Sequence, residues 1–226
     1  MDAALLRELV AARAEKRPTV LATRLTDGVQ KLVYPSDKSQ DSWLIKAVSE
    51  VLAGDKGAVI AAPDGAEWFL TPFNPPLRLI LVGAVHIAQP LAAIASLAGY
   101  DVTVVDPRTS FASSERFPGM TLVTDWPDEA MAALAPDARP AIVTLPHDPK
   151  LDDPALKAAL ASPAFYIGAL GSKKTHAARV ARLSEAGFTE SGIARIHGPV
   201  GLAIGAKSPA EIAISIMAEI TETLRT

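Results

Sequence analysis

The sequence predicts an α/β protein in which a smaller α+β domain precedes a doubly wound parallel sheet. From Leu77 onward, short apolar runs alternate strictly with helical patterns, which is typical of parallel strands joined by crossover helices. Before this region, Asn74-Pro75-Pro76 can continue neither a helix nor a strand. We therefore expect a small domain over residues 1–75 and a Rossmann-like domain over residues 76–226.

The smaller domain is predicted to contain two helices and two pairs of strands. Leucines at helical spacing indicate a helix over residues 2–17, which Pro18 ends. β-rich runs on either side of Thr26-Asp27-Gly28 indicate a hairpin. The elements expected after the first helix are strands Thr19–Leu25 and Val29–Tyr34, helix Ser42–Leu52, and strands Lys56–Ala62 and Glu67–Thr71.

The larger domain is predicted to contain short strands that are too apolar to have a solvated face, as expected of strands covered by helices on both sides. These strands are Leu79–Val82, Val102–Val105, Leu122–Thr124, Ala141–Leu145 and Phe165–Ile167. Between them we expect a helix over His86–Ala98 and another that begins at Asp153-Pro154, an N-cap followed by proline. Ser208-Pro209-Ala210-Glu211 has the pattern of a capping box and predicts the start of a last helix.

Composition excludes several classes of function. Apolar residues make up 49% and charged residues 21% of the chain, which is globular composition. A net charge of −3 leaves no basic field to hold nucleic acid or an anionic membrane surface, and no apolar run approaches the ~20 residues of a membrane span. There is no cysteine, which excludes disulfides, thiolate metal sites and cysteine nucleophiles. Because the first 17 residues lack a signal-peptide pattern, we expect a cytoplasmic protein.

The turn after the first parallel strand matches a dinucleotide-binding loop only in part. Gly83 and Ala88 occupy the first and third positions of the G-x-G-x-x-G/A pattern, whereas Val85 replaces the middle glycine that lets a pyrophosphate approach the backbone. A β-branched residue at that position argues against the usual pose of NAD. Gly83, Val85 and His86 remain candidate ligand contacts.

Two further strand ends carry candidate contacts. Asp106 ends the second strand, where an acidic side chain can accept hydrogen bonds from ligand hydroxyls; alternatively, Asp106-Pro107 only ends the strand and caps a turn. His147 follows the strand Ala141–Leu145 at the edge where open α/β sheets bind ligands, although a loop histidine is often incidental. Asp148 belongs either to the same site or to the turn that leads into the next helix.

The segment Gly168–Lys174 has the strongest pattern for binding an anion. It joins a strand to a helix and contains two glycines, a serine and two lysines. Free backbone N–H groups and the helix dipole both favour negative charge at such a position. The alternative is a solvated basic helix face shared with His176, Arg179 and Arg182. We favour a phosphate site formed by Gly168, Gly171, Ser172, Lys173 and Lys174.

A second glycine-rich segment, His197–Gly205, leads into the last helix. Its glycines indicate backbone that lies close to another body, either a ligand or the smaller domain. We expect His197 to be structural. Nothing in the sequence resembles a catalytic triad, a metal-ligand cluster or a Walker loop, so we expect neither catalytic residues nor a metal site.

Six loop motifs, taken together and in order, resemble the XdhC/CoxI family. The resemblance extends from about Asn74 to the C-terminus. Any one of these motifs alone would be weak, but six in the right order are specific. They are Val82–Gln89, Val105–Arg108, Glu115–Gly119, Thr144–Asp148, Gly168–Ser172 and Ile196–Leu202.

The resemblance implies a molybdenum-cofactor chaperone for xanthine dehydrogenase or carbon monoxide dehydrogenase type molybdenum hydroxylases. Such proteins are expected to be homodimers that bind the cofactor, shelter it while a cysteine desulfurase sulfurates it, and deliver it to the apoenzyme. Arg108 joins the candidate site through this resemblance. Two departures are the absence of a cysteine-containing N-terminal segment and Ala203, which stands where the family often has aspartate.

Two other functions remain open from the sequence. One is an NAD(P)-dependent oxidoreductase with His147 as the acid or base, which Val85 and the lack of a Tyr/Lys pair disfavour. The other is a protein that only bridges protein partners and binds no cofactor.

Overall fold

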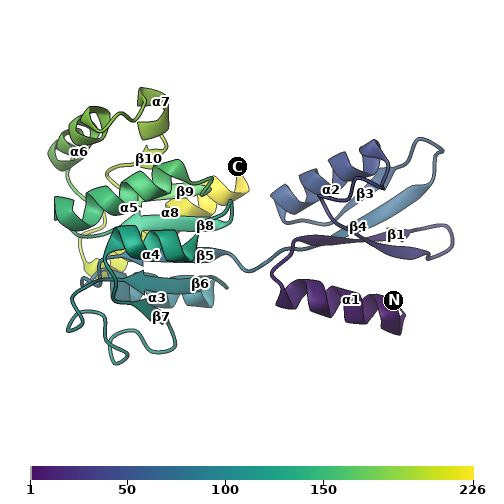
Figure 1. The fold of residues 1–226 in the computed structure, drawn as a ribbon, viewed down its shortest axis with the longest axis horizontal. Coiled ribbons are helices and arrows are strands. Elements are labelled where there is room, and N and C mark those ends of the chain that lie inside the picture. Colours follow the sequence, from purple (N-terminus) through teal and green to yellow (C-terminus); the bar gives the residue numbers. More distant parts are fainter. Residues whose placement is uncertain (1) are drawn as a thin grey trace. The chain divides into compact units, whose positions relative to one another are not determined.

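The structure is a computed structural model that describes residues 2–226. The chain forms two compact units, one that ends at Pro76 and one that comprises Leu77–Thr226. Figure 1 shows the first unit in purple and blue, and the second in teal to yellow.

The first unit is a four-stranded antiparallel sheet with one helix on each face. The strand order is β2-β1-β4-β3, so that β1 joins the two predicted strand pairs by pairing with β4 as well as β2. Leu44 and Val48 of α2 pack with Leu70 on one face, and Leu9 of α1 packs with Leu21 on the other. The elements are α1 Ala3–Ala14, β1 Thr19–Arg24, β2 Gln30–Val33, α2 Ser42–Gly54, β3 Ala58–Ala61 and β4 Glu67–Phe73.

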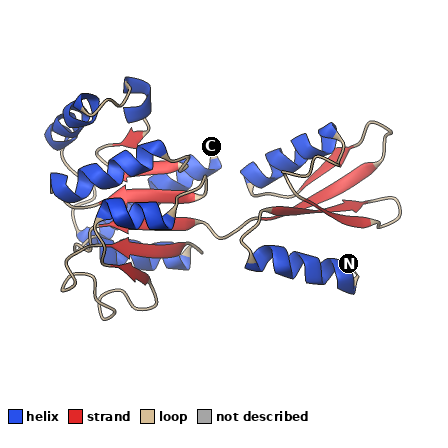
Figure 2. Ribbon diagram, in the orientation of Figure 1, coloured by secondary structure: helices blue, strands red, loops and turns tan. Residues whose placement is uncertain are grey.

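The second unit is a six-stranded parallel sheet of order β10-β9-β8-β5-β6-β7, with helices on both faces (Figure 2). This confirms the predicted α/β fold class. The strands are β5 Arg78–Val82, β6 Asp101–Val105, β7 Thr121–Val123, β8 Pro140–Thr144, β9 Tyr166–Ala169 and β10 Ile196–His197. The helices are α3 Ala88–Leu97, α4 Pro127–Leu134, α5 Pro149–Ala161, α6 Lys173–Glu185, α7 Glu190–Ile193 and α8 Pro209–Arg225.

Alternate residues of each central strand enter two separate cores. Leu79 and Leu81 of β5 pack in the core that contains Ile216 of α8, whereas Ile80 and Val82 pack in the core that contains Leu156 of α5. Because both faces of the sheet are buried in this way, the strands are nearly continuous apolar runs, as the sequence indicated, and most of their polar residues, such as Arg78, Asp101 and Thr144, lie at strand ends.

Two helices begin elsewhere than predicted. The prediction that a helix begins at Asp153-Pro154 is wrong, because α5 uses the similar pair Asp148-Pro149: the Asp148 carboxylate accepts the Lys150 N–H at 3.0 Å. Pro154 lies inside α5, and Asp153 pairs with Arg182 instead of capping. Helix α3 begins at Ala88 rather than at His86.

The start of the last helix is confirmed. The Ser208 hydroxyl accepts the Glu211 N–H, and the Glu211 carboxylate accepts the Ser208 N–H at 2.8 Å, which completes the predicted capping box. Neither α7 nor the two-residue strand β10 was predicted.

The order of the strands places a topological switch point between β5 and β8. From β5 the chain continues outward through β6 and β7, and after α4 it returns to β8 and continues through β9 and β10 in the other direction. Ligands of open α/β sheets bind outside the carboxyl ends of the strands at such a point. The loops that follow β5, β6, β8 and β9 therefore surround the place where a ligand is expected.

Candidate ligand site at the carboxyl edge of the sheet

Asp106 at the end of β6 is fully buried and ties two of these loops together. Its carboxylate accepts the Ala84 N–H at 2.8 Å, the Arg108 N–H at 3.0 Å, and Arg108 Nε and Nη2 at 2.9 and 2.7 Å. Burial opposes the charge of Asp106, but these donors outweigh burial and hold the pKa of its carboxyl below the ordinary value. Both carboxylate oxygens are thus engaged by the chain itself, so that Asp106 anchors Arg108.

Arg108 presents a fixed positive charge at this edge. The hydrogen bond to Asp106, which is the largest cause, raises the pKa of the guanidinium, and the charge of Asp148 contributes from across the switch point. The guanidinium lies 4.4 Å from the centre of the Phe111 ring, and the side chain is 42% exposed. Arg116 lies over the same ring at 5.8 Å and donates to the Phe111 carbonyl.

Phe111 was not predicted as a site residue, and Arg116 was named only as part of the motif Glu115–Gly119. The available signal was the long connection between β6 and β7, which contains arginines near aromatic residues where a crossover helix would be usual. Cation–π contacts order this connection next to the carboxyl ends of β5 and β6.

The turn after β5 leaves no space for a side chain at Gly83, because Pro146 packs against it. Gly83 has φ +98°, and a Cβ at this position would lie 2.4 Å from Cγ of Pro146, in the loop after β8. The neighbouring Ala84 N–H is taken by Asp106. The Ala84 amide is therefore not available to a pyrophosphate bound in the usual dinucleotide pose. This agrees with the sequence argument that Val85 disfavours that pose. Val85 itself is half-buried against the core, whereas His86 is exposed.

His147 and Asp148 lie at the switch point, on the loop after β8. Both are exposed, directly after the buried residues Leu145 and Pro146. Asp148 caps α5, which is the alternative that the sequence left open, and its charge also acts on Arg108. The structure therefore brings these two residues to the same edge as Arg108.

The segment between β9 and α6 forms a shorter loop than the sequence indicated. Gly168 and Ala169 are part of β9, and Gly168 leaves no room for a side chain because a Cβ would lie 2.6 Å from Val200 Cγ2. The Ser172 hydroxyl caps α6 by accepting the Thr175 N–H at 3.1 Å. Gly168 is thus enclosed in the sheet, and the residues at the helix start are Gly171–Lys174, which we call the anion loop.

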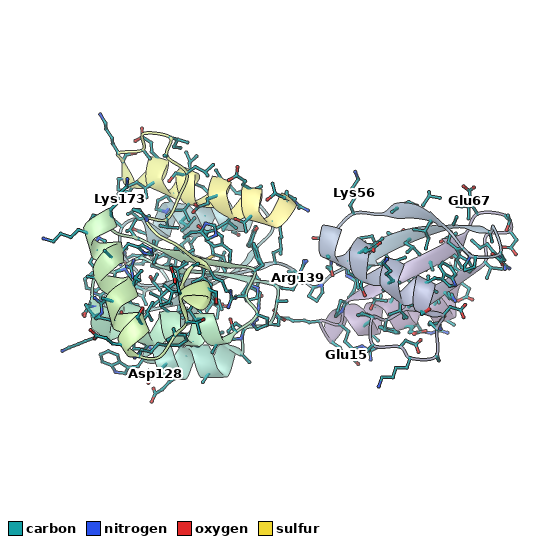
Figure 3. All side chains as sticks on the ribbon, turned by 90° about the horizontal axis from the view of Figure 1, so that it is seen from above. Glu15, Lys56, Glu67, Asp128, Arg139 and Lys173 are labelled. Atoms are coloured by element: carbon teal, nitrogen blue, oxygen red, sulfur yellow. The ribbon has the colours of Figure 1, made fainter. Side chains whose placement is uncertain are left out.

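Lys173 and Lys174 are the exposed cations of the anion loop. They occupy the first two positions of α6, and Figure 3 shows Lys173 at the periphery of this unit. Within residues 2–226, neither ammonium group has an ion-pair partner. A helix N-terminus with two such cations is an electrostatically favourable place for an anion.

The basic residues that follow on α6 do not form a solvated face. Arg179 is 1% exposed, and Arg182 forms a two-point ion pair with Asp153 at 2.6 and 2.9 Å. His176 is half-buried, and its ring lies against Gly198. The alternative of a solvated basic face is therefore wrong for the part of α6 beyond the first turn.

The glycine-rich segment before α8 packs against its own unit. A Cβ on Gly198 would lie 2.1 Å from His176 Nδ1, and one on Gly201 would lie 2.5 Å from Ser215 Oγ. His197 Nδ1 lies 3.2 Å from Glu219 Oε1, and its ring stacks on Tyr166. These two glycines thus serve internal packing, and His197 has internal partners.

The four loops together form one edge with positive groups near both ends. In the order of the strands, this edge presents the anion loop, His147 with Asp148, the turn at Gly83, and Arg108. At about 4.8 Å between strands, the four strand ends extend over roughly 14 Å.

No group of three or more His, Asp or Glu side chains within residues 2–226 is arranged to hold a metal ion. Across the same residues, every helix is too short or too polar to span a bilayer.

Comparison with known proteins gives a consistent family. A model of the XdhC Rossmann domain matches residues 79–220. The molybdenum cofactor insertion chaperone PaoD of Escherichia coli K12 is 32% identical over 152 residues, which cover 67% of this chain and 42% of PaoD. A protein of Bacillus subtilis 168 named as a probable xanthine dehydrogenase subunit is 35% identical over 156 residues, which cover 69% of this chain and 45% of that protein.

The chain spans less than half the length of these relatives. A further relative, the protein YqeB of Escherichia coli K12, is 37% identical over 145 residues, which cover 64% of this chain and 27% of YqeB. Among solved structures, a xanthine dehydrogenase from Bacillus halodurans aligns with a TM-score of 0.60 and 20% identity, covering 96% of this chain and 93% of that one. This likeness shows the fold.

Replacing Gly83 with alanine is expected to destabilise the protein by about 2–4 kcal/mol, because positive φ disfavours a side chain and the new methyl group overlaps Pro146. Urea unfolding measures this loss. Gly119→Ala is the matched control, since Gly119 has φ +75° but nothing within 4 Å of its Cβ position. An equal loss in the two variants would contradict the proposed overlap.

Asp106→Asn is expected to destabilise the protein by about 2–4 kcal/mol near neutral pH, because the amide cannot accept all four donors. Since the folded-state pKa of Asp106 lies below the ordinary 3.8, its stabilising effect exists above that value and is lost as pH falls through the folded-state pKa. The difference in unfolding free energy between variant and wild type should therefore become smaller in acid. Denaturant unfolding across pH tests this, with exposed Asp125→Asn as control; a constant gap would refute it.

Proposed function

This chain belongs to the XdhC family, and from that premise we propose that it binds the molybdenum cofactor and delivers it to a molybdenum hydroxylase of the xanthine dehydrogenase or carbon monoxide dehydrogenase type. The matched residues 79–220 contain all four loops of the candidate site. One relative, PaoD, is a molybdenum cofactor insertion chaperone. The observation that carries the proposal is the pair Lys173 and Lys174, which lie at a helix start on the carboxyl edge without an ion-pair partner in residues 2–226.

The residues at this edge fit a phosphorylated pterin. In the proposed arrangement, the ammonium groups and amides of Lys173 and Lys174 hold the phosphate. His147, Asp148 and Arg108 offer donors and acceptors to the polar edge of the pterin, and Asp106 keeps Arg108 in position. His86 and the half-buried Val85, on the turn after Gly83, border the pterin between these groups.

This site suits sequestration and release. The bound cofactor would supply molybdenum chemistry to the client enzyme, while the residues of this chain bind and orient it. Because the chain has no cysteine, sulfur cannot pass through a thiol of its own, and we propose that a cysteine desulfurase acts on the bound cofactor. The proposal further includes a homodimer, a cytoplasmic location and the molybdenum hydroxylase apoenzyme as partner.

Replacing both Lys173 and Lys174 with alanine is expected to weaken molybdopterin binding at least about tenfold, because hydrogen bonds to charged groups contribute about 1.5–3 kcal/mol. Anaerobic isothermal titration calorimetry measures the affinity of wild type and variant. Lys157→Ala with Lys38→Ala is the matched control, which removes the same charge from an exposed lysine within α5 and an exposed lysine of the first unit.

Equal molybdopterin affinity in wild type and the Lys173/Lys174 variant would remove the phosphate assignment. Tight binding of NAD(P) with turnover of an alcohol or aldehyde, in place of molybdopterin binding, would instead favour the oxidoreductase. Capture of a molybdenum hydroxylase by a chain that binds no phosphorylated ligand would favour a bridging protein.

A further inference from the structure

A buried ion pair lies behind the anion loop. Arg179 of α6 is 1% exposed and faces Asp152 of α5, which is 2% exposed. Arg179 Nη2 donates to the Leu170 carbonyl at 2.9 Å and lies 3.5 Å from Asp152 Oδ2. Leu170 immediately precedes Gly171, and its N–H donates to the Thr144 carbonyl at the end of β8. The guanidinium is therefore bonded to the segment from which the anion loop starts.

This pair is poorly arranged for joining α5 to α6. Arg179 Nε and Nη1 and Asp152 Oδ1 are buried and lack hydrogen-bond partners within residues 2–226. Each such atom costs about 1–3 kcal/mol. The adjacent pair, Arg182 with Asp153, joins the same two helices by two short hydrogen bonds. The position of Arg179 is thus better explained by its bond to Leu170 than by its ion pair.

The charge behind the loop depends on the protonation of Asp152. Burial raises the pKa of Asp152 to about 7, against the attraction of Arg179; Asp153 adds to the rise, and Arg182 opposes it. When Asp152 takes up a proton, the charge of Arg179 is no longer neutralised. His176 also lies near Arg179, and burial together with that charge lowers the pKa of its imidazole.

We propose that Arg179 is the positioning residue of the anion loop: it fixes the Leu170 carbonyl so that the loop amides face the bound anion, and it adds positive charge behind them when Asp152 is protonated. This inference rests on the proposed function, in which the anion is the phosphate of the cofactor. It implies that the affinity for an anion of constant charge falls as pH rises through the titration of Asp152, since the ionised carboxylate neutralises Arg179.

Titration with inorganic sulfate tests the proposal, because sulfate keeps its charge over the relevant pH range. Amide signals of Lys173 and Lys174 in the full chain are followed by nuclear magnetic resonance at about one unit below and one unit above the Asp152 pKa of about 7. Wild type is expected to bind about three- to tenfold more tightly at the lower pH. Asp152→Asn is expected to bind at both pH values as wild type does at the lower one.

Variants of Arg179 separate positioning from charge. Arg179→Met is expected to lose about tenfold in sulfate affinity and most of the Asp152-dependent change with pH, and Arg179→Lys to recover only part of the affinity, because an ammonium lacks the planar fork that reaches Leu170. Arg182→Met combined with Asp153→Asn is the matched control, which removes the neighbouring ion pair. Because Asp153 and Arg182 act on the Asp152 pKa in opposite directions and are removed together, this variant should keep the change of sulfate affinity with pH.

Two results would overturn the inference: an Asp152→Asn variant that keeps the wild-type pH profile, or an Arg179→Met variant that binds sulfate like wild type. Should Arg179→Met fail to fold, Asp152→Asn alone decides. Sulfate binding that depends on Lys173 and Lys174 but not on Arg179 removes only this inference. Sulfate binding that does not depend on the two lysines contradicts the anion loop as the phosphate site, and with it the observation that carries the proposed function.

Discussion

The parallel direction of the six strands in the second unit is the constraint on which the candidate site depends. Because all strands end on the same side, the residues that follow β5, β6, β8 and β9 meet at one edge although they are far apart in the sequence. The reversal of strand order between β5 and β8 then opens this edge at its middle. Helices on both faces bury the rest of the sheet and leave its edge as the place for polar groups.

Internal contacts decide which of these polar groups remain available. The Asp106 carboxylate is hydrogen-bonded to Ala84 and Arg108. Pro146 packs against Gly83, and Val200 packs against Gly168. Among the charged candidate groups that remain exposed at this edge, Arg108, Lys173 and Lys174 are positive and Asp148 is negative. This distribution separates the site from the usual dinucleotide pose, in which the first turn binds the pyrophosphate and the acidic residue binds the ribose.

The periodicity of the sequence was sufficient to predict the order of strands and helices. It was not sufficient to predict which charged side chains pair with each other. Strands buried on both faces are nearly continuous apolar runs, so the alternation of strands and helices was visible from Leu77 onward. Two Asp-Pro pairs are candidates for the start of α5; in the structure Asp148 caps the helix, and Asp153 forms an ion pair with Arg182 of α6, a partner that the sequence pattern did not reveal. The burial of Arg179 was equally hidden, because α6 is rich in charges and its acidic partner comes from another helix.

The anchoring of Arg108 by Asp106 has a consequence for how long a ligand stays. An arginine held at both Nε and Nη2 has already lost its rotamer freedom, so an anion that meets it causes little further loss of side-chain entropy. Lys173 and Lys174 are exposed and have no ion-pair partner within residues 2–226, so each gives up as much as about 2 kcal/mol of rotamer entropy when it closes on an anion. One end of the edge therefore has a cation that is already ordered, and the other has two cations that become ordered only on binding. This combination permits orientation of a guest together with a short residence time.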